Sequence, residues 1–266
     1  MDFPEKGSPS EITPRTVFIS DVHLGSEAQE SARSVALRKF LSTLHGADVS
    51  DLYILGDLFD FWFEYRSVIF SSNFPVLRAL ARVRESGVRL HYIVGNHDYW
   101  AGTFLENVIG CTLYKQPTIA EIDTTRILLC HGDGLNRRDY GYRLFKAVAR
   151  WKPAIVLFGS IHPDLAVRLG RMVSGLSRQL VNAETPGRLR EARAVRAYAF
   201  RKLQNDNIDV VVAGHCHIPT DESIEINGRA KRYINLGDWL THFTYAELVK
   251  GRITLKGFSG AERTDE

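Results

Sequence analysis

Hydrophobic residues along the chain gather into short continuous runs that end abruptly in glycine or polar residues. Five of these runs predict buried strands. They are residues 17–20, 52–55, 90–94, 127–130 and 208–213. Residues 31–44 carry apolar side chains at helical spacing, and a second helix is expected over residues 74–86. Strands that alternate with helices predict a layered α/β fold, in which ligands collect at the carboxyl ends of the strands.

Every predicted strand delivers residues that are able to bind a metal ion. In chain order these are Asp21 and His23, Asp57 and Asp60, Asn96, His97 and Asp98, His131 and Asp133, and His215 and His217. Any one cluster fits an ordinary hydrogen-bonded turn, since Gly, Asn and Asp are common turn residues. Because the same residue types recur at five strand ends, a shared site is the favoured interpretation.

The regular spacing of the strands breaks after His131, since 83 residues separate it from His215. An ordinary crossover is far shorter, so the excess predicts an insertion, which we assign to residues 137–202. Helices are expected there, because a proline is tolerated in the first turn of a helix but not in its interior. The prolines that would open these helices are Pro153, Pro163 and Pro186.

The charge of this insertion differs from that of the remaining chain. Residues 137–202 hold 15 Lys or Arg against 4 Asp or Glu, whereas the whole chain has a net charge of only +3. Apolar residues are interleaved with the basic ones throughout the segment. One interpretation is a helical hairpin with arginines on a solvated face. The other is a surface for anionic amphiphiles or membrane headgroups. No nucleic-acid recognition motif is present, so nucleic acid is not an expected partner.

Composition and length complete the expected domain organisation. We expect a mobile leader (1–14), a core (15–136 and 203–258), the basic helical insertion over the active site (137–202) and a loose tail (259–266). A hairpin is expected near residue 250. Three cysteines are too few for a disulfide framework or a thiolate zinc site. The chain lacks a signal peptide and any apolar run near the roughly 20 residues of a membrane span, which predicts a cytoplasmic protein that is soluble or peripheral on a membrane.

The recurring residues form a mixed set of oxygen and nitrogen ligands. Such a set suits Mn, Fe, Zn or Mg, and no thiolate biases it toward zinc. The number of ligands exceeds the needs of one ion. Two ions about 3.5 to 4 Å apart would polarise a phosphoryl group and activate a bridging water as hydroxide for in-line attack. Asp57 is the natural bridge between them.

Five blocks of residues, in order along the chain, resemble the calcineurin-like metallophosphoesterase superfamily. They are Asp21-x-His23, Gly56-Asp57-x-x-Asp60, Gly95-Asn96-His97-Asp98, His131 and Gly214-His215-x-His217. Together they span about residues 17–239. The resemblance implies a four-layered α/β/β/α sandwich of two mixed sheets, with the helical insertion as a lid. It also implies two divalent metal ions, with Mn²⁺ the expected metal.

The same resemblance implies a role for each matching residue. The residues matching the ligands of one metal are Asp21, His23, Asp57 and His217. Those matching the ligands of the other are Asp57, Asn96, His131 and His215. The residue matching His97 lies over the site as proton donor or phosphate binder, oriented by the one matching Asp98. His97 and Asp98 are therefore the expected catalytic residues.

A closer resemblance is to the UDP-2,3-diacylglucosamine hydrolases of lipid A biosynthesis. It rests on residues 18–25, 56–62, 131–135 and 236–239, and on Asp139 and Tyr142. Such enzymes cleave the pyrophosphate of a diacylated sugar nucleotide into UMP and a lipid sugar 1-phosphate. The resemblance implies attack by a metal-bridging hydroxide on the uridine-side phosphorus. The expected substrate contacts are Asn96, His97, Asp139 and His215. A basic and apolar insertion suits this lipid substrate and an anionic membrane surface, which predicts a peripheral position on the inner face of the cytoplasmic membrane.

Two other functions stay open at this stage. Protein phosphatases of the superfamily carry Asp-Arg-Gly where this chain has Asp60-Phe61-Trp62, which argues against a phosphoprotein substrate. His97 stands where the best-known hydrolases carry Arg, so a phosphodiesterase or nucleotidase of soluble substrates is the alternative. A non-catalytic scaffold would be expected to have lost ligands, and none is missing. The sequence does not predict the oligomeric state or the acyl-chain length.

Overall fold

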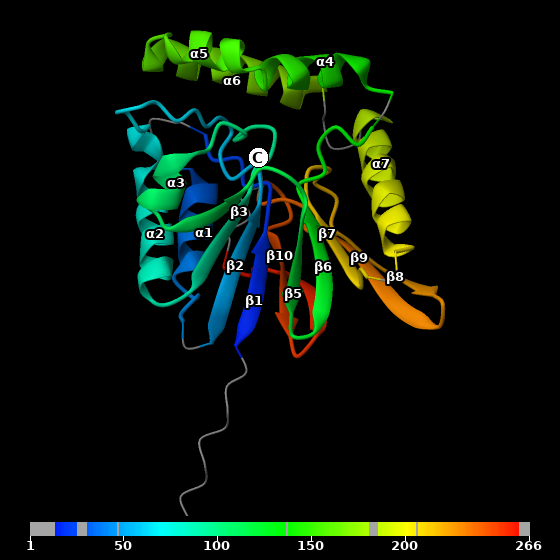
Figure 1. Cartoon of the computed structure of the whole chain (residues 1–266). Helices are drawn as coiled ribbons and strands as arrows, with labels where there is room; N and C mark the ends of the chain where they lie inside the picture. The colour runs from blue at the N-terminus through cyan, green and yellow to red at the C-terminus, as the bar shows by residue number, and fades with distance from the viewer. Residues whose placement is uncertain are drawn as a thin grey trace, which may run out of the picture.

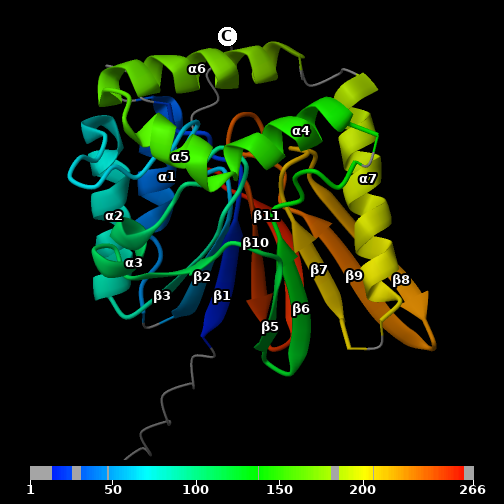
Figure 2. The ribbon, with the colours of Figure 1, turned by 45° about the horizontal axis from the view of Figure 1, so that its top comes forward.

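The fold consists of two packed β-sheets with helices on their outer faces (Figures 1 and 2). The structure is a computed structural model, and it describes residues 14–25, 31–46, 48–136, 138–180, 186–205 and 207–260. The expected leader and tail therefore lie outside the described residues, apart from residues 14, 259 and 260. The predicted α/β class with two mixed sheets is confirmed.

The first sheet has six strands in the order β11-β10-β1-β2-β3-β4. Four of them are parallel: β1 (Arg15–Ile19), β2 (Val49–Leu55), β3 (Arg89–Ile93) and β4 (Cys111–Tyr114). The other two are β10 (Thr244–Val249) and β11 (Arg252–Gly257). They form the predicted hairpin, with positive φ at Lys250 and Gly251, and β10 pairs antiparallel with β1. The sheet is thus mixed, with its parallel strands sharing one carboxyl-end edge.

The second sheet has five strands in the order β5-β6-β7-β9-β8. These are β5 (Thr118–Ile122), β6 (Thr125–Cys130), β7 (Val210–Ala213), β8 (Thr220–Ile226) and β9 (Arg229–Asn235). Strands β6, β7 and β9 are parallel to one another, while β5 and β8 close the two edges antiparallel. The five predicted strands are therefore divided between the sheets, three in the first and two in the second.

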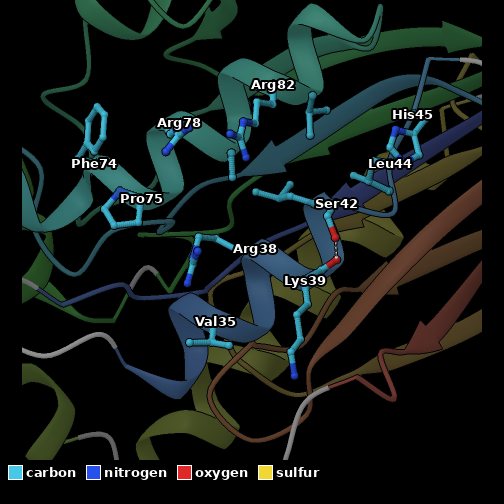
Figure 3. A pocket seen from close by; sticks show the side chains of 13 residues that line it. Val35, Arg38, Lys39, Ser42, Leu44, His45, Phe74, Pro75, Arg78 and Arg82 are labelled. Carbon is cyan, nitrogen blue, oxygen red and sulfur yellow. Dashed lines mark hydrogen bonds between the residues drawn. The ribbon is translucent and has the colours of Figure 1, made fainter.

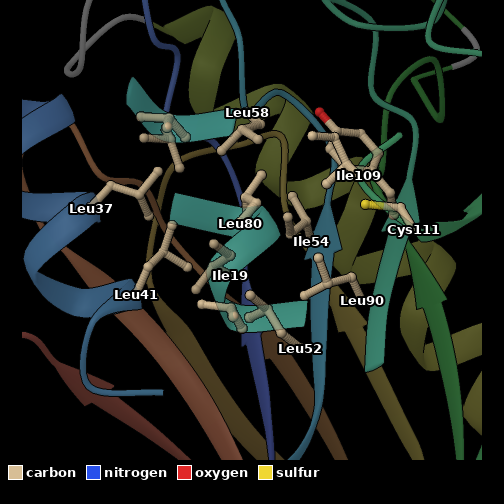
Figure 4. Packing of buried hydrophobic residues seen from close by; sticks show 14 of the residues in the cluster. Ile19, Leu37, Leu41, Leu52, Ile54, Leu58, Leu80, Leu90, Ile109 and Cys111 are labelled. Carbon is tan, nitrogen blue, oxygen red and sulfur yellow. The ribbon is translucent and has the colours of Figure 1, made fainter. Parts of the chain in front are cut away.

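Helices cover the outer face of the first sheet. They are α1 (Ala32–Leu41), η1 (Ser71–Asn73), α2 (Phe74–Glu85) and α3 (Thr103–Asn107). Pro75 lies in the first turn of α2, where its missing N–H costs nothing, and the apolar positions of this helix recur at helical spacing. Figure 4 shows Leu41 and Leu80, from α1 and α2, packed against strand residues such as Ile54. A second apolar cluster fills the space between the two sheets.

The predicted insertion divides into two parts. Helices α4 (Tyr140–Ala149), α5 (Lys152–Gly159) and α6 (Pro163–Leu180) lie across the carboxyl ends of the strands (Figure 2). Helix α7 (Pro186–Leu203) instead packs on the outer face of the second sheet and completes the four layers. It buries Val195, Ala199 and Leu203 against β6, β7 and β9. The expected boundary at residue 202 was therefore too late, because α7 contributes to the core.

Aromatic residues join α4 and α5 to the loops below. The ring of Phe158 in α5 stacks on Trp100 at 5.1 Å between centroids and lies 5.0 Å from Phe63. Trp100 Nε1 donates to the carbonyl of Ala149 at 2.9 Å, at the end of α4. Among the helices in the described ranges, none combines the length and apolar character needed to cross a membrane.

Candidate metal centre

The carboxyl ends of β1, β2 and β3 meet those of β6 and β7 where the two sheets approach. All seven residues expected as metal ligands come from these ends. Five of them have a left-handed backbone: Asp21 (φ 54°), His23 (51°), Asp57 (53°), His215 (72°) and His217 (53°). Side chains other than glycine rarely adopt this conformation, and it persists only where the surrounding structure holds it. The fold therefore stores backbone strain at the point where the sequence places its chemistry.

The first group of ligand atoms comprises Asp21, His23 and His217. The Nε2 atoms of the two histidines face each other at 3.1 Å, and Asp21 Oδ1 lies 3.3 Å from that of His217 and 3.7 Å from that of His23. A single proton shared by the two ring nitrogens would leave Asp21 Oδ1 without a hydrogen-bond donor. A divalent cation would satisfy all three atoms, so the donor set fits a metal.

The second group comprises Asp57, His131 and His215, with Asn96 beside them. His131 Nε2 lies 3.2 Å from Asp57 Oδ2 and 3.1 Å from Asn96 Oδ1. His131 Nδ1 lies 2.8 Å from the carbonyl oxygen of Leu55. Because a carbonyl can only accept, Nδ1 carries a proton and Nε2 faces the centre. A backbone acceptor that orients a histidine in this way is a common feature of metal sites.

Asp57 lies between the two groups. Its Oδ2 is 3.2 Å from His131 Nε2 and 3.9 Å from the Nε2 atom of His23 in the other group. Burial alone would raise the pKa of Asp57, but His131 and the other nearby histidines outweigh burial and hold that pKa well below its usual range. Burial, reinforced by His131, lowers the pKa of His215 to about 4.

Burial alone would lower the pKa of His23 as well, but Asp21, Asp60 and Asp57 outweigh burial and raise that pKa to about 10. Asp57 raises the pKa of His131 in the same way. Because a metal ion binds the neutral imidazole, a bound cation would displace these protons.

Backbone contacts lock the carboxylates in place. Asp57 Oδ1 accepts a hydrogen bond from the backbone N–H of His97 at 3.0 Å, and Asp21 Oδ2 accepts one from His215 at 2.9 Å. The second of these bonds joins the two sheets. The strand ends approach so closely that a Cβ atom at Gly95 would collide with Asp57, and one at Gly214 would collide with Asp21. Glycine is required at both positions because of this approach.

His97 reaches the same centre, but Asp98 does not orient it. His97 Nδ1 donates to the carbonyl oxygen of Asp60 at 2.8 Å, and its Nε2 lies 3.9 Å from Asp57 Oδ2. Asp98 accepts from the backbone N–H groups of Gly95 (2.7 Å) and Leu58 (3.0 Å), and from the hydroxyl of Tyr92 (2.5 Å). The expectation that Asp98 orients the ring of His97 was therefore wrong, because its carboxyl group turns into the protein and organises the loop.

Burial of Asp98, together with the charge of Asp57, raises the pKa of Asp98 to about 7.

Two carboxylates behind the ligand histidines were missed as site residues. His23 Nδ1 lies 3.4 Å from Asp60 Oδ1, and His217 Nδ1 lies 3.6 Å from Asp238 Oδ2. Neither pair forms a hydrogen bond at these distances, but each carboxylate lies on the side of the ring away from the centre, where carboxylates commonly orient ligating histidines. The signal for Asp60 was present at its strand end, and that for Asp238 in the Gly-Asp-Trp block after β9.

Asp139 lies at the start of α4. Its Oδ1 accepts from the backbone N–H of Tyr142 at 2.8 Å and caps the first turn of α4. The residue that connects α4 with the centre is Asp133. Its Oδ2 accepts from the hydroxyl of Tyr142 at 3.1 Å, forms an ion pair with Lys146 and lies 3.6 Å from Arg150. A contact between Asp139 and substrate stays a prediction.

Helix α7 also contributes to the rim of the centre. Glu191 Oε2 lies 3.9 Å from His215 Nε2, and Arg188 donates to the carbonyl of Cys216 at 3.2 Å and lies 3.8 Å from Asp238. Neither was expected, because both lie within the segment assigned to the insertion and no motif marks them.

The chain is similar to known proteins over most of its length. The family model for calcineurin-like phosphoesterases matches residues 14–219. The chain is 29% identical over 249 residues to the UDP-2,3-diacylglucosamine hydrolase of Porphyromonas gingivalis, covering 86% of this chain and 92% of that protein. It is 32% identical over 225 residues to the UDP-2,3-diacylglucosamine hydrolase of Aeromonas hydrophila, covering 84% and 90%. Among solved structures, an archaeal phosphodiesterase matches 92% of this chain and 99% of its own, with 14% identity and a TM-score of 0.43.

Proposed function

Because the chain belongs to the calcineurin-like phosphoesterase family, we propose that it is a metal-dependent hydrolase of UDP-2,3-diacylglucosamine. The reaction would add water across the pyrophosphate bond and give UMP and 2,3-diacylglucosamine 1-phosphate. Support for this substrate comes from relatives named UDP-2,3-diacylglucosamine hydrolase, which align with this chain over most of their own length and of its length. The order of ligand types along the chain would not by itself distinguish this substrate from others, since one fold serves many phosphoesters.

The proposed catalysis rests mainly on the convergence of seven oxygen and nitrogen ligands around Asp57. A further group of possible ligand atoms joins His23 with Asp60 and His97. We assign one metal to Asp21, His23, Asp57 and His217, and the other to Asp57, Asn96, His131 and His215. Two bound divalent ions would supply Lewis acidity for the phosphoryl oxygens and activation of the attacking water. Asp60 and Asp238 would hold the imidazoles of the first group in orientation.

His97 is the residue we assign to the substrate itself. The carbonyl of Asp60 fixes the proton on Nδ1, so Nε2 is left to face a phosphoryl oxygen or the leaving group. Burial, acting against the attraction of Asp57, lowers the pKa of His97. In the neutral ring Nε2 can only accept a hydrogen bond, so the ring would first take up a proton from solvent at Nε2. The protonated ring would then donate to a phosphoryl oxygen or pass that proton to the departing phosphate.

Hydrolysis in ¹⁸O-labelled water tests both the substrate and the phosphorus that is attacked. If water attacks the uridine-side phosphorus, the label is expected in UMP and the lipid phosphate stays unlabelled. Label in the lipid product would mean the reverse pose. No turnover of any diacyl sugar nucleotide, combined with turnover of soluble phosphodiesters, would assign the protein to the soluble phosphodiesterase alternative.

Manganese is the metal that we propose for the cell. The donors are carboxylate, amide and imidazole groups without a thiolate, and such a set accepts Mn²⁺. Protein purified without added metal and analysed for bound ions is expected to hold two ions per chain, with Mn²⁺ restoring activity after chelation. A single ion per active chain would contradict the dinuclear assignment.

We further propose that α4, α5 and α6 cover the centre and contact an anionic membrane, on the inner face of the cytoplasmic membrane. Large apolar side chains are exposed along these helices, among them Trp151 (62%), Val156 (71%) and Leu157 (72%). Basic residues accompany them along the same segment. Exposed apolar groups beside Lys and Arg are typical of helices that lie in a membrane interface, and they equally suit the two acyl chains of the substrate.

Vesicle binding tests the membrane part separately from catalysis. Each Lys or Arg near an anionic surface contributes on the order of 1 kcal/mol, and salt screens this attraction. The protein is expected to pellet with anionic vesicles at low salt and to be released at high salt. Equal binding to neutral vesicles, or none to either kind, would contradict the proposal.

A further inference from the structure

A second cavity lies away from the metal centre, in the groove between α1 and α2 (Figure 3). Its volume is about 550 Å³. Apolar residues such as Val35, Leu44 and Ala79 form part of its lining. The polar part of the lining is basic, and among the described residues that line the groove none is acidic. The basic residues are Arg38, Lys39 and His45 from the α1 side, and Arg78 and Arg82 from α2.

Three of these cations have no acidic partner among the described residues. Lys39, Arg78 and Arg82 form no ion pair with any acidic group in the part of the chain that the structure describes. Arg78 and Arg82 are four residues apart on one helix, a spacing at which like charges repel and destabilise the helix. A bound anion between α1 and α2 would turn this repulsion into attraction. The groove therefore combines the positive charge of an anion-binding site with an apolar lining that could contact hydrocarbon.

The position of the groove indicates what enters it. Helix α2 follows the carboxyl end of β2, so its first residues lie on the side of the molecule where α4, α5 and α6 lie (Figure 1). Phe74, at the start of α2, lines the groove and is 62% exposed. One end of the groove therefore lies on the side of the molecule that carries the exposed apolar helices. A free phosphate ion would need the arginines but not the apolar lining or the exposed phenylalanine.

We propose that the groove between α1 and α2 binds the phosphate headgroup of an anionic bilayer lipid, whose acyl chains leave past Phe74. Arg78 and Arg82 would contact the phosphate, and Val35 and Ala79 the glycerol and first methylenes. This site adds a specific lipid contact to the general attraction of α4 to α6, so it rests on the proposed membrane association. It does not involve the metal centre.

Two matched double variants test the site. Arg78→Gln with Arg82→Gln removes two charges from the groove. Arg229→Gln with Arg252→Gln removes two exposed charges at the starts of β9 and β11, the end of the sheets opposite the metal centre. With phosphatidylglycerol vesicles at about 0.1 M salt, where screening acts over about 10 Å, the groove variant is expected to bind at least about tenfold more weakly. The control is expected to change less than twofold.

A third variant separates a built site from diffuse charge. Ala79→Trp fills the groove with an apolar ring and leaves every charge in place, so it is expected to weaken vesicle binding as strongly as the arginine variant. Wild-type binding by Ala79→Trp, or an equal loss in both double variants, would overturn the proposal. Displacement of a short-chain phosphatidylglycerol by equimolar inorganic phosphate would also overturn the proposal, in favour of a site for a free anion. If the arginine variant lost binding to polyglutamate but bound lipid like the wild type, the groove would instead be a site for an acidic protein.

Turnover of a short-acyl, water-soluble substrate is measured on the same variants. It is expected to stay within twofold of wild type, because the groove lies apart from the metal ligands. Failure of the lipid site would leave this turnover intact, whereas failure of the proposed function would abolish it without affecting lipid binding.

Discussion

The metal centre and the helices above it are built in opposite ways. At the centre, Asp21, His23 and Asp57 are buried, strained in backbone and fixed by backbone N–H groups. Over it, α4 to α6 expose large apolar side chains, and their contacts with the rest of the protein include an aromatic cluster and the bonds of Asp133. The comparison contrasts a buried, hydrogen-bonded centre, which is common to the family, with exposed apolar helices, which we propose select the substrate.

The largest expected effect comes from Asp57, which joins the two groups of ligands. Asp57→Ala should lose both metals and nearly all turnover, because each group loses its shared carboxylate. Metal content and turnover are measured together. The matched control is Asp123→Ala, which removes an exposed aspartate that has the same left-handed backbone (φ 49° against 53°). Retention of both metals in Asp57→Ala would refute the bridging role.

His97 is expected to give the next largest effect. His97→Ala should lower turnover about 10²- to 10⁴-fold, the range for loss of a general acid or base, while metal content stays unchanged. Bound metal is counted in the same samples. A variant that had lost one metal would place His97 among the ligands, which its distance of 3.9 Å from Asp57 makes worth testing.

Asp133 tests the connection between the two regions. Asp133→Ala removes the acceptor of Tyr142 and the partner of Lys146, so α4 should be held less firmly. We expect the Michaelis constant for the diacyl substrate to rise about tenfold, as for a lost charged hydrogen bond. Turnover of a small soluble phosphodiester serves as the control. An equal loss with both substrates would instead place Asp133 in the metal centre.

The smallest effect on catalysis is expected at Lys231, which anchors α7. This buried lysine donates to the carbonyl oxygens of Leu203 (2.9 Å) and Asn205 (2.7 Å) at the end of that helix. Lys231→Met keeps most of the side-chain volume but leaves both carbonyls without this donor. The free energy of unfolding should fall by about 1 to 3 kcal/mol, with turnover at 25 °C unchanged. Denaturant titration measures the free energy of unfolding. A full loss of turnover in a folded variant would contradict the prediction and would mean that the anchoring of α7 is needed for catalysis.

Sequence patterns predicted the centre better than its surroundings. The strand ends were predictable because buried apolar runs stop where ligands begin, and α2 was placed within one residue of its observed end at Glu85. Strand β8 was not predicted, since it is an edge strand whose inner face is only partly buried and carries polar as well as apolar residues. The direction of Asp98 could not be predicted either, because the side chains of adjacent loop residues diverge according to backbone angles that no motif specifies.

The boundary of the insertion failed for a related reason. The apolar residues of α7 are interrupted by arginines, so the helix looks like the basic segment before it, although Val195 and Ala199 are fully buried. Only its packing against β6 and β7 identifies α7 as a core helix. The residues of β6 that it contacts lie far from α7 in the sequence, so a local pattern does not reveal this contact.

The close approach of Gly95 to Asp57 and of Gly214 to Asp21 has a consequence for evolution. A methyl group at either glycine would displace a carboxylate that we assign to a metal. A mutational library would therefore find these strand ends intolerant of change, whereas the exposed positions of α4 to α6 would accept many residues. New substrates would be acquired through those helices, one surface substitution at a time, while the hydrolytic chemistry is inherited unchanged.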